Sequence, residues 1–217
     1  MSQHFYRLLP KRVIDALIDV CRASFVRGVE HSAMIFGKRG EPPGAIVVGA
    51  YSIGRGGSVH IRYEEMKIIP AIASFHTHVR YPPLLSLGDG DSECYAKRRY
   101  DRWNAYEGFV IGYPSSENKG LIAFYQVADW DRFCTKVNDA YNYFEELNRS
   151  ESTELASLTA TRYLWDLLFE RGENVLTPIV IMYVGYEIYS YSFEELLRES
   201  IEIIEEEIRK HEEWEYG

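Results

Sequence analysis

Apolar residues recur at helical spacing near the start of the chain and then in short, β-like runs. After Pro10, buried-type residues recur every three to four positions, which predicts a helix that ends near Gly28. Breaks rich in Gly and Pro separate the later segments, as turns separate strands. The expected strands cover residues 31–36, 45–51, 58–63, 68–75, 108–112 and 121–127, with a second helix over 89–103. Residues 1–130 therefore predict one α/β (α+β) domain.

The pattern changes after residue 130. Residues 131–147 and 152–171 have helical periodicity, and the β-branched segment 174–191 predicts one strand or two. A last, glutamate-rich helix carries an apolar stripe of Phe193, Leu197, Ile201, Ile204 and Ile208. We expect 131–217 to be a mainly helical C-terminal extension of unknown role. Its last helix either packs on its own domain or serves as a docking or homodimerisation helix.

Composition and charge narrow the class of protein. The 217 residues include 24 Lys and Arg against 33 Asp and Glu, a formal net charge of −9. An acidic chain is a poor match for nucleic acid or an anionic membrane surface. No apolar run approaches the roughly 20 residues that span a bilayer. Three scattered cysteines without a Cys-x-x-Cys pair argue against a disulfide scaffold, so we expect a soluble, cytoplasmic protein.

The residues with the clearest chemistry follow the segment 68–75. His76 and His78 are two positions apart, so on a strand their side chains point to the same face. Asp89 comes shortly afterwards, beyond a Pro-Pro turn. Two histidines and one carboxylate, with no cysteine among them, are typical of a catalytic zinc site that leaves a position open for water.

Hydrolysis at such a metal also needs a base and a hydrogen-bond donor. Glu30 is the candidate base, because it stands at a helix-to-strand junction from which a carboxylate can enter a dry cleft. Glu64 and Glu65 are weaker candidates in a polar turn. Ser86 is placed to supply the donor for the developing oxyanion, and Ser86 with Asp89 also fits the capping pattern of a helix start. The two roles are compatible.

The pattern Glu30 … His76-x-His78-(seven residues)-Ser86-(two residues)-Asp89 resembles the signature of the JAMM, or MPN-plus, zinc metallopeptidases. The resemblance covers roughly residues 10–130. It implies that the two histidines and the aspartate bind Zn²⁺, that the glutamate is the general acid/base, and that the serine helps to stabilise the tetrahedral intermediate. It also implies a curved mixed β-sheet flanked by helices, similar to the cytidine-deaminase architecture.

The resemblance further implies a reaction and a substrate. Such enzymes hydrolyse isopeptide or peptide bonds at the C-terminus of ubiquitin or a ubiquitin-like protein, with a zinc-bound water as nucleophile. Two positions depart from the family pattern, with Val79 where a proline usually follows the second histidine and Ala33 where a glycine is usual. Neither is a ligand, so the departures concern the substrate groove more than the metal.

Several alternatives remain open. The first is a non-catalytic MPN-type scaffold subunit that binds partners in a larger complex, and the second is metal-dependent hydrolysis of a non-protein substrate. Zinc deaminase chemistry is excluded because it needs a His-x-Glu together with a Cys-x-x-Cys, and the sequence has no Cys-x-x-Cys. His31 and His60 are expected to be structural, and the segment 211–215 only superficially resembles His-Glu-x-x-His.

One basic cluster also has two interpretations. Lys97, Arg98, Arg99 and Arg102 fall on the helix expected after the zinc motif. They form either a solvated helix face or a surface that guides an acidic partner or a flexible C-terminal tail toward the metal.

Overall fold

The computed structural model describes residues 3–55, 57–169 and 175–216. Over these residues the chain forms five α-helices and one seven-stranded sheet. The helices are α1 (Lys11–Arg27), α2 (Leu87–Tyr100), α3 (Trp130–Leu147), α4 (Thr153–Leu168) and α5 (Phe193–Tyr216). The strands are β1 (His31–Phe36), β2 (Val47–Ile53), β3 (Ala71–Thr77), β4 (Gly108–Ser116), β5 (Lys119–Val127), β6 (Leu176–Val184) and β7 (Glu187–Tyr191). Three short 3₁₀ helices, Phe5–Leu8, Pro43–Ala45 and Tyr63–Lys67, complete the elements.

The sheet is open and mixed, with the strand order β2-β1-β3-β4-β5-β6-β7. Every neighbouring pair is antiparallel except β3 and β4, which are parallel. A parallel pair needs a crossover connection, and α2 supplies it between these two strands. The carboxyl end of β3 and the start of α2 are thereby brought to the same edge of the sheet.

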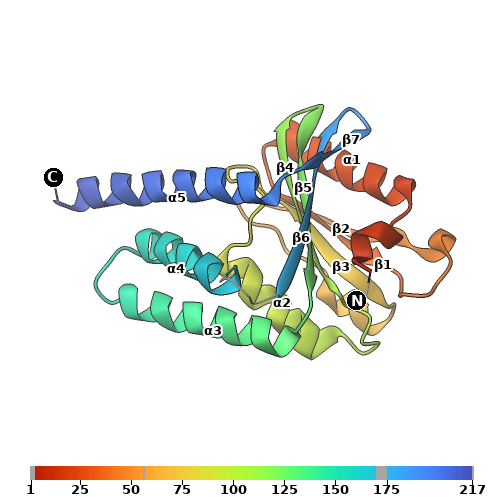
Figure 1. The fold of residues 1–217 in the computed structure, drawn as a ribbon, viewed down its shortest axis with the longest axis horizontal. Helices are drawn as coiled ribbons and strands as arrows, with labels where there is room; N and C mark the ends of the chain where they lie inside the picture. The colour runs from red at the N-terminus through yellow and green to blue at the C-terminus, as the bar shows by residue number, and fades with distance from the viewer. Residues whose placement is uncertain (1–2, 56, 170–174, 217) are drawn as a thin grey trace.

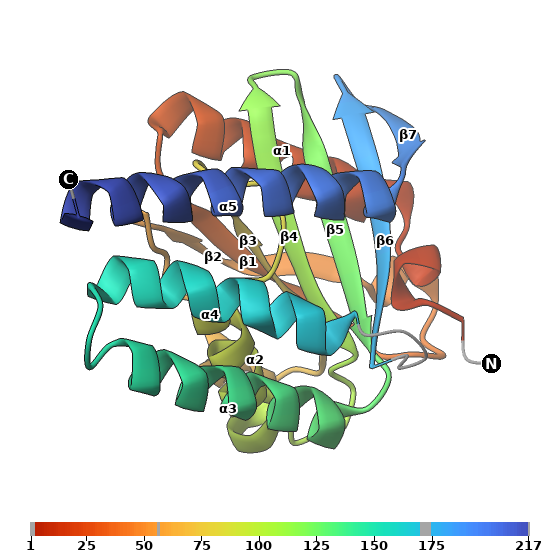
Figure 2. The same cartoon turned by 60° about the vertical axis from the view of Figure 1, so that its left-hand side comes forward.

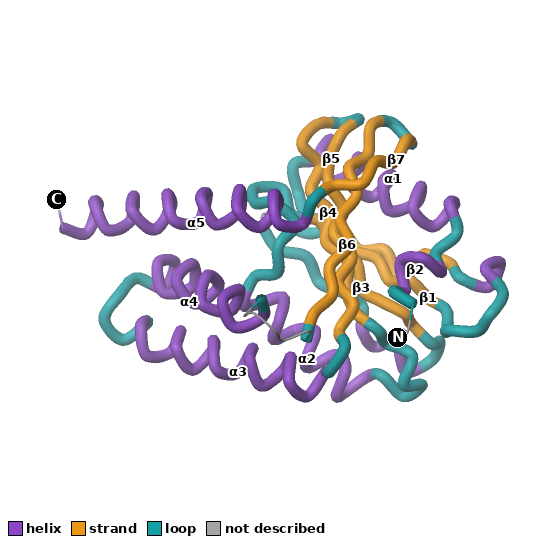
Figure 3. Tube along the Cα trace, viewed as in Figure 1, coloured by secondary structure: helices purple, strands orange, loops and turns teal. Residues whose placement is uncertain are grey.

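Helices cover both faces of the sheet, as Figures 1 and 2 show. The helix α1 lies on one face, whereas α3, α4 and α5 lie side by side over the other, with α2 beneath them. Figure 3 shows the strands as one continuous layer between the two groups of helices. Alternation along the strands supplies both cores: Phe109 and Ile111 of β4 face the α2–α5 side, and Val110 between them faces α1.

The α/β class and the C-terminal helices are confirmed, and most predicted elements are found within a few residues of their expected ends. The strand predicted over 58–63 is wrong. Apart from one bridge between Arg55 and Ser58, this segment has no strand pairing, and it leads into the 3₁₀ helix Tyr63–Lys67. Tyr63 and Met66, three residues apart, are buried on one side of that helix, so the periodicity of the segment is helical.

The sheet continues beyond residue 130. Strand β6 pairs with β5 along its whole length, from Leu176 opposite Val127 to Val184 opposite Lys119, and β7 pairs with β6. The segment 174–191 therefore holds two strands over its described residues, 175–191. Residues 131–217 are expected to form a mainly helical extension. The described residues of this segment share one sheet and one core with residues before 130.

One disulfide joins Cys94 of α2 to Cys134 of α3. The bond was not predicted from the sequence, in which 40 residues separate the two cysteines. Cys21 is free and buried. The cytoplasm is a reducing compartment, in which disulfides are uncommon. The cytoplasmic location expected from the cysteine pattern therefore stays a prediction. None of the described helices combines the length and the apolar character needed to span a bilayer.

Candidate metal centre

The two histidines of the HxH motif stand at the carboxyl end of β3. Ala73 and Phe75 point toward α1, so the alternate residues Ser74 and His76 point toward α2. The His76 side chain is almost fully buried. His78 follows the strand directly, and its backbone N–H donates to the carbonyl of Gly112 at 2.8 Å. This bond extends the β3–β4 pairing by one residue and keeps both imidazoles on the same side.

Asp89 reaches the histidines from the first turn of α2. Ser86 is the N-cap of that helix, and its hydroxyl accepts the backbone N–H of Asp89 at 3.2 Å. In return the Asp89 carboxylate accepts the backbone N–H of Ser86 at 3.0 Å and its hydroxyl at 2.7 Å. This reciprocal capping box fixes the carboxylate at the helix start. Asp89 is therefore both a member of the capping box and a predicted ligand.

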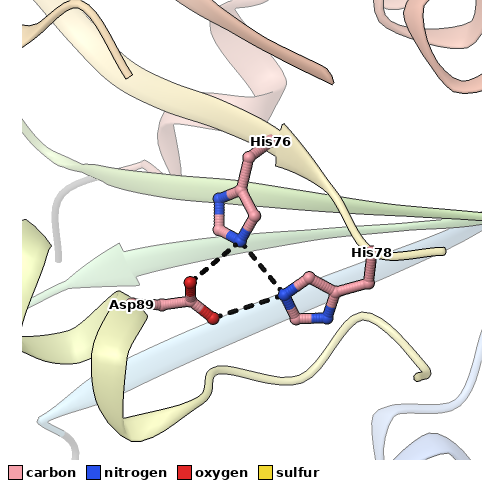
Figure 4. Close-up of side chains that lie close together, drawn as sticks. All are labelled: His76, His78 and Asp89. Carbon is pink, nitrogen blue, oxygen red and sulfur yellow. Dashed lines mark hydrogen bonds and ion pairs between the residues drawn. The ribbon is translucent and has the colours of Figure 1, made fainter. Parts of the chain in front are cut away.

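The three predicted ligands converge (Figure 4). The two histidine Nε2 atoms lie 3.1 Å apart. Oδ1 of Asp89 lies 3.3 Å from Nε2 of His76, and Oδ2 lies 3.3 Å from Nε2 of His78. In a tetrahedral site with metal–ligand distances of roughly 2.0–2.1 Å, two donor atoms lie roughly 3.3 Å apart. The spacing of the donors therefore fits a single zinc-sized ion.

Among the described residues, this is the one group of three or more His, Cys, Asp or Glu side chains close enough to share a metal ion. The second ring nitrogen of His78, Nδ1, has a hydrogen-bond partner as well, because it lies 3.2 Å from the carbonyl oxygen of Pro82. A ring N–H that donates there leaves the lone pair of Nε2 for a metal. Nδ1 of His76 is buried and has no hydrogen-bond partner among the described residues.

The electrostatics of the group favour a positive charge between the donors. Burial alone would favour the neutral acid of Asp89, but His76 and His78 outweigh it and hold the pKa of Asp89 well below its usual value. Burial alone would likewise lower the pKa of His76, yet Asp89 outweighs it and the net pKa is raised. A carboxylate that stabilises a proton on a neighbouring imidazole stabilises a metal cation in the same position.

Glu30 lines the same cleft as the three ligands and Ser86. This cleft, which we call the metal cleft, has a volume of about 500 Å³. Glu30 immediately precedes β1, which pairs with β3 so that Ser32 lies opposite His76. Partial burial raises the pKa of Glu30, against the opposing effect of His78 and His76. A carboxylate of raised pKa beside a metal site is suited to accept and return a proton.

Sequence reasoning missed one carboxylate in this cleft. Glu93 of α2 is 1% exposed and lines the cleft one helical turn after Asp89. Its oxygens accept hydroxyl hydrogen bonds from Tyr63 and Ser74, each at 2.6 Å, and from Tyr106. Burial raises its pKa even though these three donors lower it. The only sequence signal was the four-residue spacing from Asp89, which places both side chains on one face of α2.

The remaining sequence candidates lie elsewhere or have other partners. Glu64 and Glu65 belong to the 3₁₀ helix Tyr63–Lys67, and Glu65 pairs with Arg62 at 2.7 Å. His60 lines the metal cleft but is exposed and lies outside the ligand group. The buried His31 bonds the carbonyl of Val29 at 2.8 Å.

Two further features belong to helices outside the ligand group. On α5, Nδ1 of His211 lies 2.9 Å from the carbonyl of Glu207. Within the basic cluster, Lys97 bonds Asp101 at 2.7 Å and Arg98 bonds the carbonyl of Cys94 at 3.3 Å. These bonds tie part of the cluster to its own helix and the turn that follows.

A scan against protein-family models finds no match for this chain, and a search of curated proteins finds no similar sequence. A function for this chain is therefore proposed from the geometry of the site and from the motif alone.

Proposed function

We propose that this protein is a zinc-dependent peptidase of the JAMM type. The observation that carries the proposal is the convergence of His76, His78 and Asp89 at zinc-like spacing in a cleft that also contains Glu30 and Ser86. These are the five residues of the motif. Glu30 lies just before β1, and the other four come from residues 76–89. The mixed sheet with a β3–α2–β4 crossover is compatible with the MPN fold that the motif implies.

The donor chemistry suits zinc. Two neutral imidazoles and one carboxylate make three protein ligands, which is the number a catalytic zinc site uses. When bound there, zinc would lower the pKa of a water molecule and polarise the scissile carbonyl. The metal cleft leaves open space beside the ligands for that water and for a peptide.

The proton transfers fall to Glu30. Its carboxylate takes a proton from the attacking water as the new carbon–oxygen bond forms. It then gives that proton to the leaving amine as the carbon–nitrogen bond breaks, so the carboxylate is restored at the end of the cycle. The burial that raises its pKa makes both directions accessible.

Ser86 has two assigned tasks. In the structure its hydroxyl donates to Asp89 at 2.7 Å, which orients that ligand. Stabilising an oxyanion requires the hydroxyl to rotate toward the substrate. The bond from the backbone N–H of Ser86 to the Asp89 carboxylate, 3.0 Å long in the structure, does not depend on that rotation. A serine at this N-cap can therefore serve both tasks.

The substrate class follows from the resemblance of the motif. We propose isopeptide or peptide bonds at the C-terminus of a ubiquitin-like protein, whose extended tail would lie across the metal cleft as an added strand. A cytoplasmic location, and a partner or second copy bound through the C-terminal helices, belong to the same proposal.

The test is cleavage of a ubiquitin-like protein fused through its C-terminal tail to a fluorescent protein. The zinc-loaded enzyme should release the fluorescent protein, a chelator should stop the release, and added zinc should restore it. His76→Ala should be inactive. The matched control is His60→Ala, which removes an imidazole from the same cleft outside the ligand group and should remain active.

Other outcomes would redirect the proposal. A protein that binds zinc but cleaves neither linear fusions nor isopeptide-linked conjugates would favour hydrolysis of a non-protein substrate. A protein that binds the ubiquitin-like partner without zinc and without cleavage would favour the scaffold alternative.

A further inference from the structure

A second cavity lies beside the metal cleft. It has a volume of about 160 Å³ and lies between the loop that precedes α2 and the helices α4 and α5. The lining includes Tyr81 and Ser86 from the loop, Ser157, Leu158 and Trp165 from α4, and Ile204 from α5. We call this cavity the apolar pocket, because most of these residues are aliphatic or aromatic and none of them is Asp, Glu, Lys, Arg or His.

The apolar pocket adjoins the metal cleft. Tyr81 and Ser86 line both cavities. The hydroxyl of Ser86 is 2.7 Å from the carboxylate of Asp89, so a residue that lines the pocket is hydrogen-bonded to a proposed metal ligand. A peptide held at the metal centre can therefore place a neighbouring side chain in the pocket.

Hydrogen bonds between α4 and the loop make the pocket preformed. The indole N–H of Trp165 donates to the carbonyl of Leu85 at 2.6 Å, and the hydroxyl of Thr161 accepts the backbone N–H of Leu87 at 3.2 Å. From the sheet, the hydroxyl of Tyr125 donates to the carbonyl of Pro83 at 2.7 Å. Preformed, mostly apolar cavities with a few fixed polar groups are typical ligand sites.

We propose that the apolar pocket binds one large aliphatic or aromatic side chain of the peptide substrate, near the bond that is cleaved. The inference rests on the proposed function, which it deepens by naming a specificity pocket made by residues of the C-terminal segment. An apolar cavity of roughly 150 Å³ is large enough for benzene, so the pocket accommodates a side chain the size of Leu or Phe. A charged side chain would lose its hydration there without gaining an ionic partner.

A peptide cleavage assay tests the specificity. The zinc-loaded enzyme is given a library of internally quenched peptides, and cleavage sites are mapped by mass spectrometry. One position near the scissile bond should prefer Leu, Ile, Met or Phe over Gly or Asp by about tenfold or more, the selectivity expected when one apolar side chain is buried. Equal cleavage of all peptides would overturn the proposal and leave the peptidase function standing.

Filling the pocket should remove the preference. Ser157 is exposed at the pocket on α4, and Ser157→Leu adds a side chain there while raising helix propensity. The variant should lose about tenfold in kcat/KM on peptides with the preferred residue and little on Gly peptides. Thr159→Leu is the matched control, because Thr159 lies on the same helix outside the pocket and should leave the preference unchanged.

Binding in the absence of cleavage gives an independent readout. Methyl-labelled full-length protein is titrated with N-acetyl-leucinamide, with N-acetyl-glycinamide as the control. The methyl signals of Ile203, Ile204 and Leu158 should shift with the leucine compound alone, and Ser157→Leu should abolish the shifts. Shifts without any peptide cleavage would support the pocket while the peptidase proposal fails. The absence of shifts, or equal shifts with both compounds, would overturn the pocket.

Discussion

The Nδ1 atom of His78 lies 3.2 Å from the carbonyl oxygen of Pro82, within the same short loop. A ring proton donated to that carbonyl fixes the tautomer of His78 and directs Nε2 toward His76 and Asp89. The Pro82-Pro83 turn therefore orients a proposed metal ligand as well as linking β3 to α2. The same loop continues to Ser86, which orients Asp89. One loop between two elements thus sets the geometry of two of the three ligands.

Ser86→Ala should lower both the stability of the protein and its affinity for zinc. The loss of zinc affinity should be larger than the loss of a helix cap alone would cause. The substitution removes a helix cap, which costs about 0.5–2 kcal/mol, and also removes the hydroxyl that orients Asp89. Loss of an outer contact to a ligand typically lowers metal affinity by about 10- to 100-fold. Competition with a fluorescent zinc chelator measures the affinity, and thermal unfolding measures the stability.

The matched control is Ser152→Ala. Ser152 caps α4, and its hydroxyl accepts the N–H of Leu155 at 3.3 Å, away from the ligand group. This variant should lose comparable stability and keep the wild-type zinc affinity. If both serine variants bind zinc as tightly as the wild type, Ser86 has no role in orienting Asp89.

Glu30→Gln should retain zinc and lose cleavage. The amide cannot accept and return a proton, and a general acid–base group typically contributes about 10²- to 10⁴-fold to the rate. Glu64→Gln removes an exposed carboxylate from a nearby segment and should cleave normally. Steady-state cleavage of the fluorescent fusion compares the two. Equal activity of Glu30→Gln and the wild type would assign the base to another residue.

Glu93 should make the stability of the metal-free protein depend on pH. Burial raises its pKa in the folded state above the ordinary value of 4.5, so the folded protein holds this proton where the unfolded chain has released it. The free energy of unfolding therefore falls as pH rises from the ordinary carboxyl pKa to the raised one. The slope over that interval is about 1.4 kcal/mol for each pH unit.

Glu93→Gln lacks this titration. Its free energy of unfolding, relative to the wild type, should increase as pH rises over that interval, as urea denaturation at a series of pH values would show. A difference between the two proteins that is constant with pH would mean that Glu93 has the same pKa in the folded and unfolded chains.

The disulfide should contribute to stability. It joins residues 40 apart in sequence, and a loop of that length corresponds to roughly 3–4 kcal/mol in the chain-entropy treatment. A reductant should lower the Tm of the wild type. The Cys94→Ala/Cys134→Ala double variant should already have a lower Tm and should not respond to reductant. An unchanged Tm of the wild type after verified reduction would contradict this contribution.

Much of the fold could be predicted because the periodicity that indicates a helix or a strand lies within one short segment of the chain. The helix α1 follows from its periodicity between Pro10 and Gly28, and β1 occurs at the predicted residues 31–36. The segment 58–63 was misassigned because Val59 and Ile61 alternate as in a strand. Its backbone instead lies beside the metal cleft, where the carbonyl of His60 accepts the hydroxyl of Ser32 at 3.1 Å.

The candidate site also has one part that local spacing predicted and another part that only the packing of distant segments forms. His76, His78, Ser86 and Asp89 lie within one short stretch of chain, so their spacing alone indicated a metal group. Glu93 and the apolar pocket depend on packing between distant segments. The hydroxyls that satisfy Glu93 come from the 3₁₀ helix Tyr63–Lys67, from β3 and from the segment before β4, and no periodicity in the sequence relates them. The Cys94–Cys134 bond requires α2 and α3 to be adjacent, which the sequence does not reveal.

The zinc content of the purified full-length protein, measured by plasma mass spectrometry after dialysis against a weak chelator, tests the central claim most directly. The wild type, Glu30→Gln and His60→Ala should each retain one zinc per chain, and His76→Ala should retain almost none. A wild type that holds no zinc, or a His76→Ala variant that holds as much as the wild type, would contradict the assignment of His76, His78 and Asp89 as a catalytic metal site.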